Sequence, residues 1–127
     1  MKKIILMLLI IANVEAQEIC SILNGSKILA QDDENTYLGK ITNSFDSNSI
    51  FNDYGAYGSE FNAKSIWNEF STFGSKFSMY SPFNNFTSTP PMIIKNGKII
   101  AYLSSNKNIA SSISANLIKA LCKDELR

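Results

Sequence analysis

The chain contains no histidine, so it lacks the side chain that most often serves as a general base or a metal ligand. Phosphate-binding loops, dinucleotide-binding fingerprints and the Gly-x-Ser-x-Gly elbow of hydrolases are also absent. Asp53 and Glu69 occupy equivalent places in a repeat, but acidic residues in a first helical turn are better explained by the helix dipole than by catalysis. The sequence therefore predicts a protein that is not an enzyme and that carries no metal and no cofactor.

The sequence also has almost no net charge. The chain carries 12 basic and 11 acidic residues, which nearly cancel. Proteins that bind nucleic acid normally present a strongly basic face to the phosphate backbone. The balanced composition therefore predicts that nucleic acid is not a partner.

Cysteine is scarce, and the two residues present, Cys20 and Cys122, form no Cys-x-x-Cys motif that would indicate a redox role. In an oxidising compartment an isolated pair most simply forms one disulfide. This bond would close a loop of about 100 residues, which makes it strongly stabilising in the chain-entropy description. Two buried free thiols are the alternative interpretation.

Long apolar runs are limited to the N-terminus, where residues 4–12 follow a short basic start. The run is shorter than the roughly 20 residues that span a bilayer, so it predicts a signal peptide over residues 1–16, cleaved after Ala16. A lipoprotein modified at Cys20 is a competing interpretation, disfavoured because the preceding residues are not small. We expect a single domain over residues 17–127 with no later transmembrane segment, exported to the periplasm or secreted.

A tandem repeat is the most prominent feature that is present, and it occupies about residues 45–91. Segments 49–61, 65–77 and 81–86 align with a constant offset of 16 residues. Each copy begins with serine, then isoleucine or proline, an aromatic residue and asparagine. The first two copies end in Gly-Ser-x-Phe, which marks the repeat unit clearly.

Short helices are the local structure that this repeat predicts. Pro82 follows Ser81 at the position where a helix tolerates proline best, which makes the leading serine of each copy an N-cap. Gly58 and Gly74 fall where a glycine commonly ends a helix. Aromatic residues at i, i+3 and i+6 share one helical face, so we expect helices of about two turns that pack through their rings.

Two β-hairpins and a C-terminal helix flank the repeat in the predicted fold. Residues 26–31 and 36–41 predict one hairpin, and residues 92–95 and 98–103 predict another around an Asn-Gly turn. Ser114 is a suitable N-cap for a helix with apolar residues at helical spacing. We expect an α+β fold: a small antiparallel sheet of two hairpins, an inserted array of short aromatic-rich helical repeats, and a C-terminal helix.

The repeat aromatics leave two functions open. If the rings form the core, asparagines such as Asn52 satisfy backbone groups, and the protein is a structural or protein-interaction module of the cell envelope. If some rings line an exposed groove, they would stack on sugars, and the partner would be cell-wall glycan rather than an envelope protein. The candidate binding residues are Tyr54, Tyr57, Trp67 and Tyr80. The solvent exposure of the rings distinguishes the two interpretations.

A resemblance rests on the runs Tyr37-Leu38-Gly39, Ser49-Ile50-Phe51-Asn52, Ser65-Ile66-Trp67-Asn68 and Phe73-Gly74-Ser75, followed by Pro90-Pro91 and the Asn-Gly hairpin. Together they resemble a group of small exported bacterial proteins whose middle segment repeats Tyr-Gly-Ser and Ser-Ile-Trp-Asn. The resemblance covers about residues 29–103. It implies an exported location and this repeat architecture, and it transfers no activity and no site residues.

Overall fold

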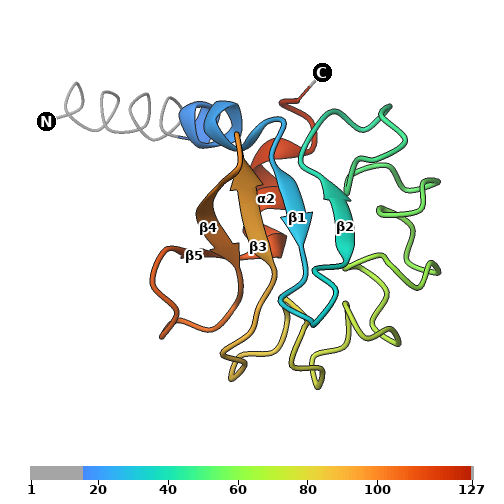
Figure 1. The fold of residues 1–127 in the computed structure, drawn as a ribbon. Coiled ribbons are helices and arrows are strands. Elements are labelled where there is room, and N and C mark those ends of the chain that lie inside the picture. Colours follow the sequence, from blue (N-terminus) through green and yellow to red (C-terminus); the bar gives the residue numbers. More distant parts are fainter. Residues whose placement is uncertain (1–15, 127) are drawn as a thin grey trace, which may run out of the picture.

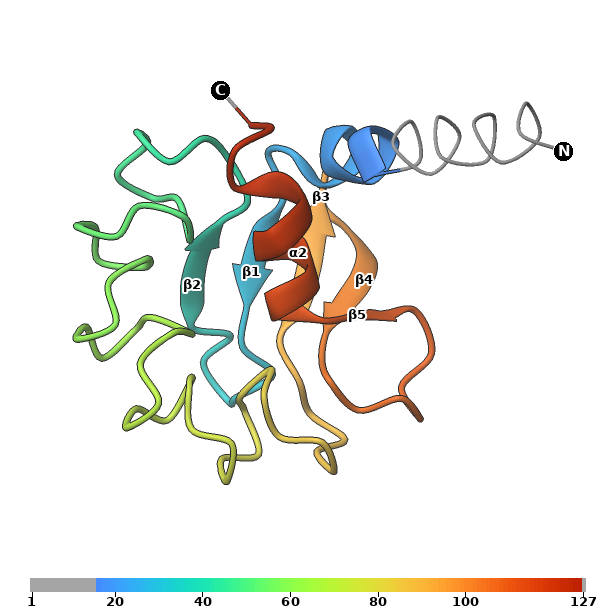
Figure 2. The ribbon, with the colours of Figure 1, turned by 180° about the vertical axis from the view of Figure 1, so that it is seen from behind.

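The computed structural model describes residues 16–126 as a five-stranded sheet with a helix on one face and a long looped segment around one edge (Figure 1, Figure 2). The predicted signal peptide lies outside the described residues, except for Ala16. Residues 16–23 are helical, an element that the sequence pattern does not predict. Across residues 16–126, no helix combines the length and the apolar character that a membrane crossing requires.

Both predicted hairpins are present, and they pair into one sheet. β1 (Lys27–Leu29) pairs with β2 (Tyr37–Lys40), and β3 (Met92–Lys95) pairs with β4 (Lys98–Leu103). β1 and β3 pair with each other in antiparallel fashion, which joins the hairpins. β5 (Ser112–Ile113) then pairs with β4 in parallel. The purely antiparallel sheet is therefore corrected to a mixed one, because the loop after β4 returns the chain to that strand in the same direction (Figure 1).

The predicted turn and cap act as their residue types require. Asn96 and Gly97, with φ of 54° and 76°, adopt the two positive φ angles of the hairpin turn. α2 (Ala115–Cys122) begins after Ser114, whose side-chain oxygen accepts a hydrogen bond from the Leu117 backbone N–H. These elements are fixed by local chemistry.

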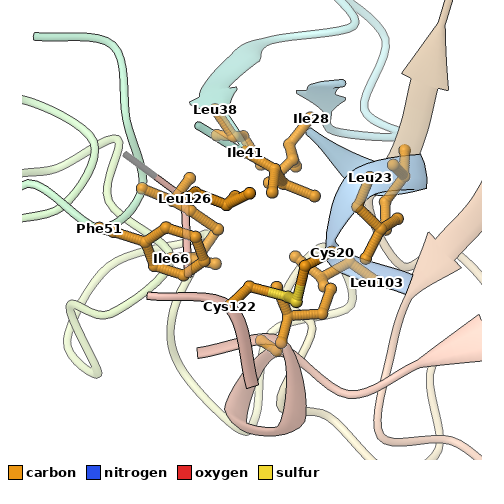
Figure 3. Close-up of a cluster of buried hydrophobic side chains, with 14 of the residues drawn as sticks. Cys20, Leu23, Ile28, Leu38, Ile41, Phe51, Ile66, Leu103, Cys122 and Leu126 are labelled. Carbon is orange, nitrogen blue, oxygen red and sulfur yellow. A yellow bond between two sulfur atoms is a disulfide. The ribbon is translucent and has the colours of Figure 1, made fainter. Parts of the chain in front are cut away.

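The hydrophobic core lies between the sheet and α2, and the repeat segment closes its side (Figure 3). Its fully buried members include Ile28, Leu38, Ile93 and Leu103 from the sheet, Ile118 from α2, and Ile50, Phe51 and Ile66 from the repeats. The Cys20–Cys122 disulfide, with a Cα–Cα distance of 5.4 Å, joins the helical residues 16–23 to α2. This bond is compatible with an oxidising, exported environment.

The repeat segment consists of consecutive turns, which corrects the expected array of short helices. From Asn43 to Thr87 a backbone N–H bonds to the carbonyl three residues earlier, and the next such bond starts where the last one ended. The step is three residues, except for four-residue steps from Gly55 to Ser59 and from Ser71 to Ser75. Four steps of three and one of four make the 16-residue period. The aromatic spacing of three therefore reflects the turn period and not a helical face.

Side chains at the start of the turns explain why no helix forms. Every starting residue except Gly55 is serine, asparagine, aspartate or threonine, and its side-chain oxygen accepts the N–H two residues later, as Ser65 does from Trp67. Such local bonds compete with the helical i to i+4 pattern. Asn52 and Asn68 also donate to the carbonyls of Asp46 and Asn62, so the asparagines do satisfy backbone groups.

Gly58 and Gly74 do not end helices, and the structure assigns them another purpose. Neither has a positive φ. A Cβ atom on Gly58 would lie 2.0 Å from the Asn52 carbonyl oxygen, and one on Gly74 would lie 2.0 Å from the Asn68 carbonyl oxygen. Glycine is therefore required because two stretches of backbone touch at these points.

Replacing Ser49 with alanine tests the buried part of the turn ladder. The Ser49 hydroxyl is fully buried, donates to the Thr42 carbonyl at 2.9 Å and accepts from the Phe51 N–H at 3.0 Å. We expect the free energy of unfolding in urea to fall by about 1–3 kcal/mol, because two backbone groups lose their partner. Ser59→Ala is the matched control, since Ser59 accepts one exposed bond from Phe61 at 3.2 Å. Equal losses in the two variants would contradict the buried role.

Candidate functional site

Six aromatic side chains of the repeat segment are almost fully exposed, with 83–98% of their surface accessible to solvent. They form two sets with a 16-residue spacing: Phe45, Phe61 and Phe77, and Tyr54, Phe70 and Phe86. We call these six side chains the outer rings. Rings of this size are usually buried, and a large exposed apolar surface marks a site of interaction. The outer rings are therefore accessible to a ligand or a partner from solvent.

Between the outer rings the chain returns to the core, which fixes where each ring can point. The inner positions carry small, β-branched or conformationally restricted residues that are buried. They are Ser49, Ile50, Gly58, Ser65, Ile66, Gly74, Ser81 and Pro82. Figure 1 shows the result as a series of loops that extend away from β2 and from the lower end of the sheet. Anchored inner positions and free outer positions alternate along the segment.

A groove of about 780 Å³ lies between the repeat segment and α2, which contributes Lys119 to its lining. An adjoining hollow of about 530 Å³ shares Trp67 and Phe70 with it. Three of the outer rings line this combined surface. We call it the aromatic groove, and its aromatic residues are Phe61, Trp67, Phe70, Phe77 and Phe83.

Trp67 is held rigidly in the groove. Its indole N–H donates to the Ile50 carbonyl oxygen at 2.6 Å, and its ring packs against Phe83 at a centroid distance of 5.9 Å. The Lys119 ammonium lies 4.4 Å from the Trp67 ring centroid. These three contacts from separate segments orient the ring before any ligand arrives, which lowers the entropic cost of binding.

Charges around the groove are mixed and nearly balanced. Glu60 and Glu69 line both parts of it, and Lys76 and Lys119 line the larger part. At its margin the Lys123 ammonium forms a salt bridge with Asp53 at 3.2 Å. Within residues 16–126 no group of three or more acidic, cysteine or histidine side chains could hold a metal ion. The groove therefore offers aromatic faces and dispersed hydrogen-bonding groups, without a strong field of one sign.

The four candidate residues predicted from sequence are not brought together. Tyr54 is an outer ring, but it does not line the aromatic groove. Tyr57 packs edge-on against Tyr37, with 5.1 Å between the two ring centroids. Burial of the Tyr37 phenol raises its pKa. Tyr80 is partly exposed and also lies outside the lining, so only Trp67 lies in the groove.

Phenylalanines are the groove residues that the sequence prediction missed. The candidate binding residues do not include Phe61, Phe70 or Phe77, because apolar rings are normally buried. The three-residue spacing of serine and asparagine is a signal for the turns themselves. It does not show which turns face the core, which only the tertiary structure decides.

Comparisons with known proteins add no relatives to this description. No family model, no curated protein and no solved structure matches the chain.

Proposed function

We propose that this protein is an exported, non-enzymatic binding module of the cell envelope that takes cell-wall glycan in the aromatic groove. The observation that carries the proposal is the placement of two almost fully exposed rings, Phe70 and Phe77, in a concave surface with the oriented Trp67. Ligand sites combine such apolar faces with a few placed polar groups.

The chemistry of a glycan matches this surface. A sugar ring presents an apolar C–H face that stacks on an aromatic ring, and hydroxyl groups that need donors and acceptors. Glu60, Glu69 and Asn116 supply carboxylate and amide groups beside the rings. The balanced charge favours an uncharged stretch of polymer over a strongly charged partner. The 16-residue recurrence of the outer rings also suits a ligand built from repeating units.

A double variant, Phe70→Ala/Phe77→Ala, tests the proposal. We expect its affinity for purified peptidoglycan in a pelleting assay to fall about 30-fold, since each stacked ring contributes about 1 kcal/mol. Stability should not change, because both side chains are exposed. Trp67 is the single tryptophan of the chain, so its fluorescence reports occupation of the groove by soluble wall fragments.

Phe45→Ala/Phe86→Ala is the matched control. It removes two outer rings of similar exposure, 87% and 92%, that do not line the groove. This control should retain wild-type affinity. Equal weakening of both double variants, or wild-type protein that neither pellets with the wall nor changes its fluorescence, would contradict glycan binding. Direct binding of a purified envelope protein, lost in Phe70→Ala/Phe77→Ala, would instead identify a protein-interaction module.

A further inference from the structure

Four lysines gather at one end of the sheet, where β1 and β4 begin and β2 and β3 end. Strand pairing places Lys27 opposite Lys40 and Lys95 opposite Lys98. Ile94, the neighbour of Lys95, lies opposite Lys27, so the two lysine pairs lie at the same end of the sheet, with Lys27 and Lys95 on opposite faces. Opposed residues in a sheet have Cα atoms about 5 Å apart. We call these four lysines the basic end.

The lysines of the basic end outnumber the acidic groups placed near them. Within residues 16–126 none of its four lysines forms a salt bridge with a carboxylate. The acidic turn at residues 32–34 connects β1 to β2 at the opposite end of the sheet. Glu18 lies among the helical residues 16–23 beside the basic end, and Asp124 and Glu125 follow Cys122, which is bonded to Cys20 of the same helix. A small positive excess therefore remains at this end: four lysines against Glu18, Asp124 and Glu125.

Exposed isoleucines accompany these lysines. Ile99 and Ile100 follow Lys98 along β4, with 50% and 37% of their surface exposed. The Lys95 ammonium donates to the Ile22 carbonyl oxygen at 2.6 Å, which holds the helical residues 16–23 against the hairpin. Figure 1 shows this helix beside the end of β3. Its Ile22 side chain is 60% exposed, and the Ile22 carbonyl is the group that the Lys95 ammonium contacts, so an exposed apolar residue lies next to this lysine.

We propose that the basic end docks this protein on an anionic lipid bilayer. Lysines near such a surface are attracted to its negative potential, and apolar side chains beside them enter the region between headgroups and acyl chains. The exposed isoleucines favour a bilayer over a soluble anion, because a soluble phosphate offers no apolar phase. The surface shares no residue with the aromatic groove, so the inference does not depend on the proposed glycan binding.

Sedimentation with lipid vesicles tests this inference. One preparation contains phosphatidylglycerol in phosphatidylcholine, and the other contains phosphatidylcholine alone. We expect the wild-type protein to partition onto the anionic vesicles more strongly, with binding that weakens as salt is added. Lys27→Gln/Lys98→Gln should lower partitioning onto the anionic vesicles about 30-fold, because each exposed lysine contributes about fivefold.

Lys64→Gln/Lys107→Gln is the matched control, since it removes the same total charge from two exposed lysines outside the basic end. It should change partitioning less than about twofold, because distant charges are screened. Ile99→Ser should weaken vesicle binding without altering the salt dependence. Equal binding to both vesicle types, no binding to either, or equal losses in the two double variants would overturn the proposal. Displacement by inorganic phosphate of matched ionic strength would assign the lysines to a soluble anion and overturn it as well.

Discussion

Replacing Gly74 with alanine is expected to lower the free energy of unfolding by about 3 kcal/mol or more, or to prevent folding altogether. The added Cβ atom would lie 2.0 Å from the Asn68 carbonyl oxygen and 2.8 Å from the Ile66 carbonyl oxygen. Both obstacles are backbone atoms of a segment anchored in the core, so neither can move away as a flexible side chain could. Urea denaturation followed by Trp67 fluorescence measures the loss. Gly58→Ala should behave in the same way, because it meets the Asn52 carbonyl oxygen at the same distance.

Gly55→Ala provides the control in the same segment. Its nearest contacts are the Ser47 carbonyl oxygen at 3.1 Å and the Asn52 side chain at 3.3 Å, and its φ is not positive. The stability of this variant should lie within about 1 kcal/mol of the wild type, since the neighbours can shift slightly. If Gly74→Ala were as stable as Gly55→Ala, the close approach of the turns would be refuted.

Removal of the disulfide in Cys20→Ala/Cys122→Ala is expected to cost about 4–5 kcal/mol of stability. The bond links residues 102 positions apart. Closing a loop of about this length removes a large amount of chain entropy from the unfolded state, which stabilises the folded protein. The helical residues 16–23 are also attached to α2 by this bond, so their hydrogen-exchange protection should fall further than that of β3. Thermal unfolding of the wild type and the variant gives the difference.

Reducing agent supplies the control for this experiment. Dithiothreitol should bring the wild-type protein to the stability of the double alanine variant and should leave the variant itself unchanged. A wild-type protein whose unfolding temperature does not respond to reduction would show that the bond adds nothing to stability. The expected dependence on oxidation agrees with the proposed export, because the bond would persist outside the cytoplasm.

The aromatic repeat shows how a correct period can accompany a wrong local structure. The 16-residue spacing was evident from the aligned copies, and so were the serine, glycine and aromatic positions within them. A spacing of three between aromatic residues fits both a helical face and a chain of three-residue turns. The starting residues decide between these structures, because serine and asparagine at every third position bond to the backbone locally and withdraw it from the helix. A proline at the second position of Ser81-Pro82 suits either arrangement, since it fixes φ for a turn as well as for a first helical residue.

The candidate site depended more strongly on tertiary structure. Trp67 was named from sequence, but its place beside Phe70, Phe77 and Lys119 follows from the way the turns fold against α2. Phe51 and Phe70 are both phenylalanines of the repeat segment, yet Phe51 is 1% exposed and Phe70 is 90% exposed. Composition cannot separate them, because the difference lies in whether the turn faces the core.

The sequence by itself determined the features that depend on neighbouring residues: both hairpins, the Asn96-Gly97 turn, the Ser114 cap, the C-terminal helix and the repeat period. The single pair of cysteines also predicted the disulfide, and the structure decided between it and two free thiols. Only the tertiary structure decided the parallel β5, the alternation of inner and outer turns, the backbone contacts at Gly58 and Gly74, and the grouping of four lysines at one end of the sheet. These features arise between segments distant in the chain, where packing and strand register outweigh the local preferences of each residue.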